Sequence, residues 1–439
     1  MGTIRRALMG AVILCALTNG AVAQETTLRI ATVDNGDMIR LQQLSQTFMR
    51  DNPGIALEWI TLDENLLRQR VAIDVSTGAG RFDVVSIGTY EAPIWAERGW
   101  LSPLDTMPGD FQPDDILPTI RDALSFDGAL YAAPFYGESS FTMYRTDLFE
   151  AAGLEMPRAP SWDFIKSAAA TIAAHDPDVY GICLRGKPGW GENVALLTAM
   201  ANAYGARWFD ENWRPQLDSE AWARTVGDYV ALMSQFGPPE ATENGFGENL
   251  ALFQAGRCGV WIDATAAASF VTDPSASTVA DSVGFALAPD KGLGKRSNWL
   301  WAWALAVPQS SRHPDAAKRF ISWATSQAYA ELVASEQGWA HVPPGTRASL
   351  YENPRYRDAA PFAELTFESI QTADETSPTV EPVPYTGIQY VAVPEFQGIG
   401  TAVGQQIADV LAGEITVEEA LRNAQWVAEK VVQHARFVQ

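Results

Sequence analysis

The chain of 439 residues has few of the side chains on which metal sites and nucleophilic hydrolases depend. It contains only three cysteines and four histidines, and His175, His313, His341 and His434 show no zinc-site spacing. No Gly-x-Ser-x-Gly motif accompanies them, so a serine or cysteine hydrolase is not indicated. We expect no catalytic residues, no metal and no cofactor. The paired carboxylates of a glycoside hydrolase stay open as an alternative, because the chain has 53 acidic residues.

Positive charge is also scarce. The 31 basic residues leave a net charge of −22, and a surface this acidic repels phosphate backbones and anionic lipid. A near match to a phosphate-binding loop at residues 181–188 carries Pro188 where a Ser or Thr hydroxyl would hold magnesium. The glycines within residues 398–404 have the wrong last spacing for a dinucleotide fingerprint. Nucleic acids and nucleotides are therefore not expected as partners.

Long apolar runs are missing too. Residues 7–17 form a short apolar run after two arginines, and the small residues at 21–23 are typical of a cleavage site. This run is shorter than the roughly 20 residues of a membrane span, so residues 1–23 are predicted to be a secretory signal peptide of a periplasmic protein. Cys183 and Cys258 then remain, and they either pair in an oxidising compartment or stay reduced on buried strands.

The apolar pattern predicts an α/β fold. Strands are expected at residues 28–33, 56–60 and 82–87, with helices between them, which indicates a largely parallel sheet covered on both faces. A second series of strands and helices begins near residue 161, where Ser161 is a plausible N-cap. Near the other end, Thr416 and Glu419 form a capping-box pattern. Two α/β lobes fit this order better than one.

Four segments carry a recognisable pattern. Residues 131–149, 160–163, 253–263 and 307–323 resemble the family 1 extracellular solute-binding proteins of ATP-binding-cassette (ABC) importers, over nearly the whole chain after the signal peptide. Within that family, the sequences Arg-Gly-Lys-Pro-Gly-Trp-Gly-Glu-Asn at 185–193 and Trp-Ile-Asp-Ala-Thr at 261–265 are similar to the sorbitol- and mannitol-binding branch.

This resemblance implies a two-lobed periplasmic-binding-protein fold like that of maltose-binding protein, with ligand held in the cleft between the lobes. By analogy, residues 24–137 and 301–350 form lobe 1, and residues 138–300 and 351–439 form lobe 2. The implied function is capture of a sugar alcohol and its delivery to ABC permease subunits at the inner membrane, by a monomer without enzymatic activity. A receptor for mono- or oligosaccharides of the same family is the first rival, and an exported carbohydrate-active enzyme is the second.

Open α/β sheets bind ligands beyond the carboxyl ends of their strands. This rule selects Asn35 and Asp37 after the first predicted strand, Glu64 after the second, and Thr89 with Tyr90 after the third. The family pattern points to the same loops. Vicinal hydroxyls seek carboxylates, amides and cations, and the C–H faces of a polyol prefer flat aromatic rings.

Other candidates follow the expected crossings between lobes. Glu138 stands at the first crossing, as a ligand contact or a solvated hinge acid. Lys187, Trp190 and Glu192 lie on a loop broken by glycine and proline directly after a strand, which favours exposure toward a cleft, although Trp190 could pack on its own loop. Arg185 either contacts ligand or braces a carboxylate.

The last candidates are mostly aromatic. Trp261 and Asp263 share a strand, whose terminal carboxylate could accept two hydroxyls or cap the following helix. Trp299, Trp301 and Trp303 alternate along one strand and share a face, which is either core or a stacking surface. Of these we select Trp299 and Trp301, since they lie at the second crossing. Three residues of a late segment that commonly closes family pockets have no assigned roles: Tyr385, Gln389 and Tyr390.

Overall fold

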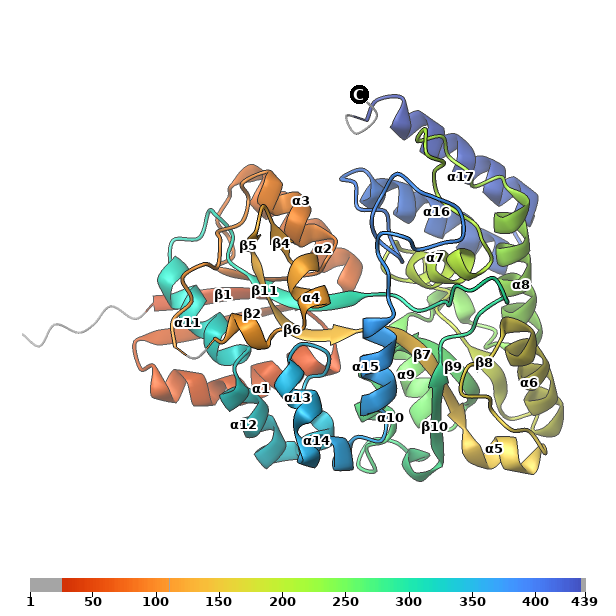
Figure 1. The fold of residues 1–439 in the computed structure, drawn as a ribbon, viewed down its shortest axis with the longest axis horizontal. Helices are drawn as coiled ribbons and strands as arrows, with labels where there is room; N and C mark the ends of the chain where they lie inside the picture. The colour runs from red at the N-terminus through yellow and green to blue at the C-terminus, as the bar shows by residue number, and fades with distance from the viewer. Residues whose placement is uncertain (1–25, 110, 436–439) are drawn as a thin grey trace, which may run out of the picture.

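The computed structural model describes residues 26–109 and 111–435, arranged around two sheets that lie side by side (Figure 1). The signal peptide predicted at residues 1–23 lies outside this part of the chain. The five-stranded sheet has the order β2 (Ile55–Leu62), β1 (Thr26–Val33), β3 (Val84–Ile87), β11 (Trp301–Ala306) and β6 (Ala132–Glu138). The four-stranded sheet has the order β10 (Val283–Leu287), β7 (Ser140–Arg145), β9 (Cys258–Ala264) and β8 (Tyr180–Cys183). A small hairpin joins β4 (Ser125–Phe126) to β5 (Ala129–Leu130).

Lobe 1 is built around the five-stranded sheet. β1 pairs in parallel with β2 and with β3, as the alternation of strands and helices predicts. β11 is antiparallel to both β3 and β6, so the sheet is less uniformly parallel than expected. The difference arises because the chain leaves this sheet along β6 and returns to it along β11 (Figure 1).

Lobe 2 is built around the four-stranded sheet, in which β8 and β9 are parallel while β7 is antiparallel to β9 and β10. Ser139 alone separates β6 of one sheet from β7 of the other. Its backbone is fixed to Thr265, whose N–H donates to the Ser139 carbonyl at 2.8 Å and whose Oγ1 accepts from the Ser139 N–H at 3.2 Å. The first crossing between lobes is therefore a buried, hydrogen-bonded strand.

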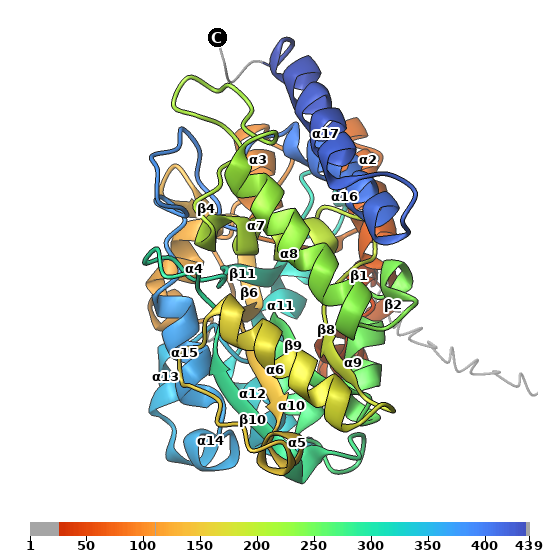
Figure 2. The ribbon, with the colours of Figure 1, turned by 90° about the vertical axis from the view of Figure 1, so that its right-hand side faces the viewer.

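Helices cover the outer faces of both sheets (Figures 1 and 2). Those before and after the lobe 1 strands are α1 (Gly36–Asp51), α2 (Glu64–Thr77), α3 (Glu91–Glu97), α4 (Pro118–Ala123), α11 (Pro314–Ala324) and α12 (Gln327–Gln337). Those connecting the lobe 2 strands are α5 (Thr146–Ala151), α6 (Trp162–His175), α7 (Asn193–Ala203), α8 (Glu220–Phe236), α9 (Phe246–Gln254) and α10 (Ala268–Val271). Ser161 caps α6 as predicted, since its side chain accepts from the Phe164 N–H at 3.1 Å.

The last segment contains α13 (Ala348–Glu352), α14 (Pro354–Ala359), α15 (Ala363–Gln371), α16 (Phe396–Leu411) and α17 (Val417–Val432). α14 packs against the short turn Trp339–His341 that follows α12, whereas α16 and α17 pack on α7 and α8. α15 contacts β6, β7 and β10, between the two groups. We therefore propose that a third crossing between the lobes runs through α15, which begins 13 residues beyond the lobe boundary at residue 350 expected from the sequence.

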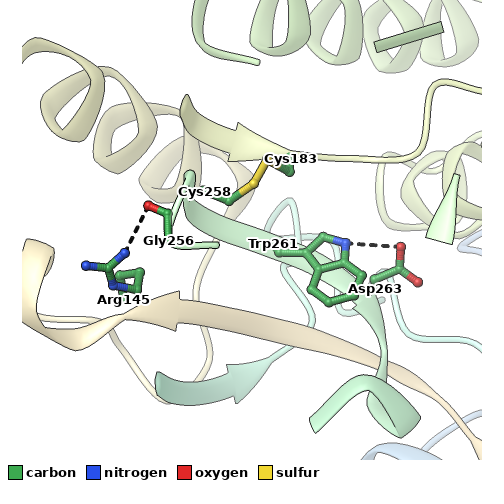
Figure 3. The surroundings of a disulfide bond; sticks show 6 residues. All are labelled: Arg145, Cys183, Gly256, Cys258, Trp261 and Asp263. Atoms are coloured by element: carbon green, nitrogen blue, oxygen red, sulfur yellow. Dashed lines mark hydrogen bonds between the residues drawn. A yellow bond between two sulfur atoms is a disulfide. The ribbon is translucent and has the colours of Figure 1, made fainter. Parts of the chain in front are cut away.

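A disulfide joins Cys183 at the end of β8 to Cys258 at the start of β9, so the structure shows the first of the two alternatives left open for these cysteines (Figure 3). The bond links positions 75 residues apart. On the same strand as Cys258, the Trp261 indole points toward Asp263 and donates to it at 3.2 Å. The bridge therefore fixes the strand that carries two of the predicted site residues.

Candidate functional site

A cavity of about 350 Å³ lies between the lobes, at the strand ends where the sequence predicts a site. Its walls come from the loop after β1, the start of α2 and the end of β6 on one side, and from the loop after β8 and the start of α9 on the other. Nine predicted residues line it: Asn35, Glu64, Glu138, Arg185, Lys187, Trp190, Glu192, Trp299 and Trp301. Gln389, named without a role, lines it as well.

The predicted polar residues on the lobe 1 wall are an amide and two acids. Asn35 caps α1 by accepting from the Met38 N–H at 3.0 Å, and its side-chain amide donates to the Tyr136 hydroxyl at 2.9 Å. Glu64, at the start of α2, accepts from the Arg68 guanidinium at 2.8 Å. Burial raises the pKa of the Glu138 carboxyl well above its ordinary value, although the charge of Arg185 opposes this shift. A protonated Glu138 would donate as well as accept a hydrogen bond.

The lobe 2 wall is organised by a buried ion pair. Arg185 donates to both oxygens of Asp263, at distances of 2.6 to 3.1 Å, and to the Gly191 carbonyl at 2.9 Å. The pKa of Arg185 lies above its ordinary value: burial lowers it, but the charge of Asp263 and the hydrogen bonds to it outweigh this effect. Arg185 therefore braces a carboxylate, one of the two roles considered for it, and because it also lines the cavity, contact with ligand stays a prediction.

Lys187 and Glu192 complete this wall. Lys187 donates to Asp63 of lobe 1 at 2.7 Å. Burial lowers the pKa of Lys187, but this bond and the charges of Glu192 and Asp63 outweigh it and raise the pKa overall. Burial raises the pKa of Glu192 to about 7, with Arg185 acting in the opposite direction. The two walls thus meet through an ion pair at the rim of the cavity.

Tryptophan rings form the remaining surface. Trp299, Trp301 and Trp303 all line the cavity, and the rings of Trp301 and Trp303 meet edge to face with centroids 5.6 Å apart. Trp190 reaches across from lobe 2, with its ring centroid 5.9 Å from that of Trp301. Each of the three rings is at least nine-tenths buried and still borders the cavity, and a stacking role toward ligand stays a prediction.

Three lobe 1 candidates do not line the cavity. Asp37 turns inward on α1, where it pairs with Arg40 at 2.6 Å. Thr89 accepts a hydrogen bond from the Tyr390 hydroxyl at 3.1 Å. Tyr90 donates to the Val393 carbonyl at 2.9 Å, behind the cavity wall. Each side chain is buried with a partner inside the protein, so it is not presented to a ligand in this structure.

Trp261 and Asp263 in lobe 2 do not line the cavity either. Both are completely buried, and the Trp261 ring packs against Phe246 and Phe253. Asp263 accepts from Arg185, from the Trp261 indole and from its neighbour's N–H, so its oxygens are already used. The two residues support the wall from behind. Tyr385 and Tyr390 are also buried away from the cavity lining.

Several lining residues were not selected from the sequence. Arg68 follows Glu64 by four positions on α2, and that helical spacing is a signal that could have found it. Tyr136 precedes Glu138 by two positions on β6 and so shares its face. Phe246 enters from the start of α9, and no feature of the sequence connects it to the site. The other lining side chains outside the prediction include Asp34, Asp63, Glu248 and Trp303.

Three buried polar atoms of lining residues have no hydrogen-bond partner among the described residues: Trp190 Nε1, Glu192 Oε2 and Gln389 Oε1. An unpaired buried polar atom is costly, so such atoms are normally satisfied by water or by a ligand. The set contains a donor and two acceptors beside flat indole faces. This chemistry suits a small molecule with many hydroxyl groups and exposed C–H bonds.

The chain as a whole is similar to known proteins. The chain is 52% identical to the mannitol-binding protein of Pseudomonas aeruginosa over 94% of each chain. The crystal structure of an ABC transporter solute-binding protein from Agrobacterium vitis, with bound D-mannitol, is 61% identical, covers 94% of this chain and 99% of its own, and superposes with a TM-score of 0.92.

More distant structures share the fold. A ribitol-bound solute-binding protein from Agrobacterium radiobacter is 23% identical, with a TM-score of 0.81 over 93% of this chain and 99% of that chain. Its identity is low, so it bears on the two-lobed architecture alone. The family model for bacterial extracellular solute-binding proteins matches residues 35–331. The chain therefore belongs to the bacterial extracellular solute-binding protein family.

Proposed function

We propose that this protein is the polyol-binding component of an ABC importer and that D-mannitol, or a closely related hexitol such as sorbitol, is its ligand. The cavity carries this proposal, because it combines indole rings with polar atoms that have no hydrogen-bond partner among the described residues, in about 350 Å³. The mannitol-binding protein of Pseudomonas aeruginosa and the mannitol-bound protein of Agrobacterium vitis support the choice of ligand.

Binding here requires no covalent step. The ligand's C–H faces pack on Trp299 and Trp301, and its hydroxyls pair with Glu192, Gln389 and the Trp190 indole. Hydrogen bonds to charged groups contribute about 1.5–3 kcal/mol each, so a few of them supply the roughly 8 kcal/mol of micromolar binding after the costs of ordering. Lobe closure over the ligand then presents one composite surface to permease subunits.

The proposal also covers where the protein acts and what happens to the ligand. The protein acts in the periplasm after removal of residues 1–23, and it releases the polyol unchanged to the permease. A receptor for mono- or oligosaccharides would use the same fold, so the ligand panel has to include both classes.

Thermal denaturation tests this function. The protein is first freed of ligand. Its melting temperature is then measured alone and after addition of D-mannitol, D-sorbitol, D-arabinitol, maltose or glucose. A ligand that binds only the folded state stabilises it by about 2.7 kcal/mol at 100 times its Kd. A polyol should give the largest shift. Protection by maltose or glucose alone would contradict the proposal, and a ligand recovered in altered form would indicate an enzyme.

A further inference from the structure

Arg68 occupies the place where the two lobes meet. It is buried on α2 of lobe 1, and its guanidinium bonds to Glu64 at 2.8 Å and to Glu91, two carboxylates of the same lobe. The ring centroids of Trp301 and Trp303, on β11 of lobe 1, lie 4.9 and 5.1 Å from the guanidinium carbon. All four contacts come from residues of lobe 1, so none of them needs a lobe 2 residue.

The shortest ring contact of Arg68 comes from the other lobe. The Trp190 ring centroid lies 4.0 Å from the guanidinium carbon, and Trp190 belongs to the loop after β8 of lobe 2. The next residue leaves no room for a side chain against lobe 1, because a Cβ on Gly191 would lie 2.0 Å from Glu64 Oε1. The loop after β8 therefore packs directly against Arg68 and Glu64.

We propose that Arg68 is a positioning residue that couples ligand binding to lobe closure through the face of Trp190. When the lobes part, the guanidinium stays in its lobe 1 contacts and loses the Trp190 ring. When they close, the cation stacks on the ring and holds the Trp190 indole N–H at the cavity. The inference rests on the proposed function, because it assumes that ligand enters this cavity.

The planar guanidinium is essential to this role. Its two faces and five donors allow it to bind Glu64 and Glu91 in its plane while it stacks on a ring, and the point charge of a lysine cannot do both. A cation over an indole favours the contact by about 2-fold to 30-fold in equilibrium constant. Loss of the contact should therefore appear mainly as faster ligand release.

The first test is a double-mutant cycle on the full chain, with release of D-mannitol followed by stopped-flow tryptophan fluorescence. We expect Arg68→Lys to speed release by roughly 2-fold to 30-fold, and Trp190→Leu to speed it as well. The double variant should release ligand more slowly than the product of the two effects predicts, because both changes remove one contact. Multiplicative effects, or an unchanged rate in Arg68→Lys, would overturn the proposal.

Arg347→Lys is the matched control. Arg347 is also buried in lobe 1 and stacks on the Phe111 ring at 5.9 Å, but it bonds to Thr325 and the Phe111 carbonyl, which lie away from the cavity. This variant should leave the release rate unchanged even if it lowers stability. An equal acceleration in both variants would show that loss of a buried arginine, rather than the contact with Trp190, is responsible.

A second test leaves Arg68 intact, in case its variant does not fold. Site-specific replacement of Trp190 by fluorinated tryptophans keeps the ring shape and withdraws electron density from its face. Release of D-mannitol should then accelerate step by step with fluorination, and no trend would overturn the proposal. If the unaltered protein binds no polyol, the proposed function fails instead, so the two failures are distinguishable.

Discussion

Replacement of Asp263 by alanine should destabilise the protein strongly, because it removes the counter-charge of a buried guanidinium. Asp263 is completely buried and accepts from Arg185 Nε at 2.9 Å and Arg185 Nη2 at 2.6 Å. After the substitution, Arg185 keeps its bond to the Gly191 carbonyl and a 3.7 Å approach to Glu192. These contacts leave most of its desolvation uncompensated.

Breaking a buried ion pair from one side costs about 3–5 kcal/mol. The nearby Glu192 offsets part of this cost, so we expect a loss of about 3 kcal/mol in the free energy of unfolding. Urea unfolding of the ligand-free protein, with the disulfide intact, measures it. Asp263 lies behind the cavity wall and does not line the cavity. The substitution should therefore lower the free energy of unfolding without removing a direct contact to the ligand.

Two further variants make this test specific. Asp51→Ala removes a carboxylate from a highly exposed pair with Arg50 and should change stability by less than about 1 kcal/mol. In the double variant Arg185→Met with Asp263→Leu, both charges of this pair are removed together, so part of the lost stability should return. A loss below about 1 kcal/mol in Asp263→Ala would refute the account of the buried pair.

Three other changes have definite expected results. Burial raises the pKa of Glu192 from 4.5 to about 7, so the folded protein holds this proton more tightly than the unfolded chain. Stability should therefore fall as pH rises from about 4.5 to 7, by at most about 3 kcal/mol, and Glu192→Gln should flatten that slope in urea unfolding at pH 5 and pH 8. A Cβ on Gly36 would lie 2.3 Å from the Phe270 ring of the opposite lobe; Gly36→Ala should weaken D-mannitol binding in calorimetry, and adding Phe270→Ala should restore it. Replacing Cys183 and Cys258 by serine should cost about 4 kcal/mol, since the bond closes a long loop, and an unchanged melting temperature would contradict this.

The sequence predicts the position of the site better than the orientation of its side chains. Asn35 and Glu64 follow parallel strands whose ends meet at one edge of the sheet, and both line the cavity. Asp37 stands two positions after Asn35, about 200° around the helix, and therefore points inward. The sequence places the start of this helix only to within a residue or two. It therefore cannot tell which of the two side chains faces the cavity and which faces the interior.

In lobe 2, several features of the site depend on tertiary packing and could not be predicted from the sequence. Trp261 and Asp263 share one face of β9, which tertiary contacts make internal: Phe246 of α9 covers Trp261, and Arg185 covers Asp263. Phe246 and Glu248 reach the cavity from α9, more than 50 positions after Glu192 on the loop that precedes them in the lobe 2 wall. Arg185 lies beside a buried carboxylate 78 positions away, a pairing that no local pattern specifies.

Calorimetric titration of the purified, ligand-free protein with D-mannitol tests the central claim most directly. The account predicts one site per chain with micromolar or tighter affinity, weaker or no binding of maltose, and mannitol recovered chemically unchanged. Absence of a binding signal for every hexitol, with saturable binding of a disaccharide, would contradict it.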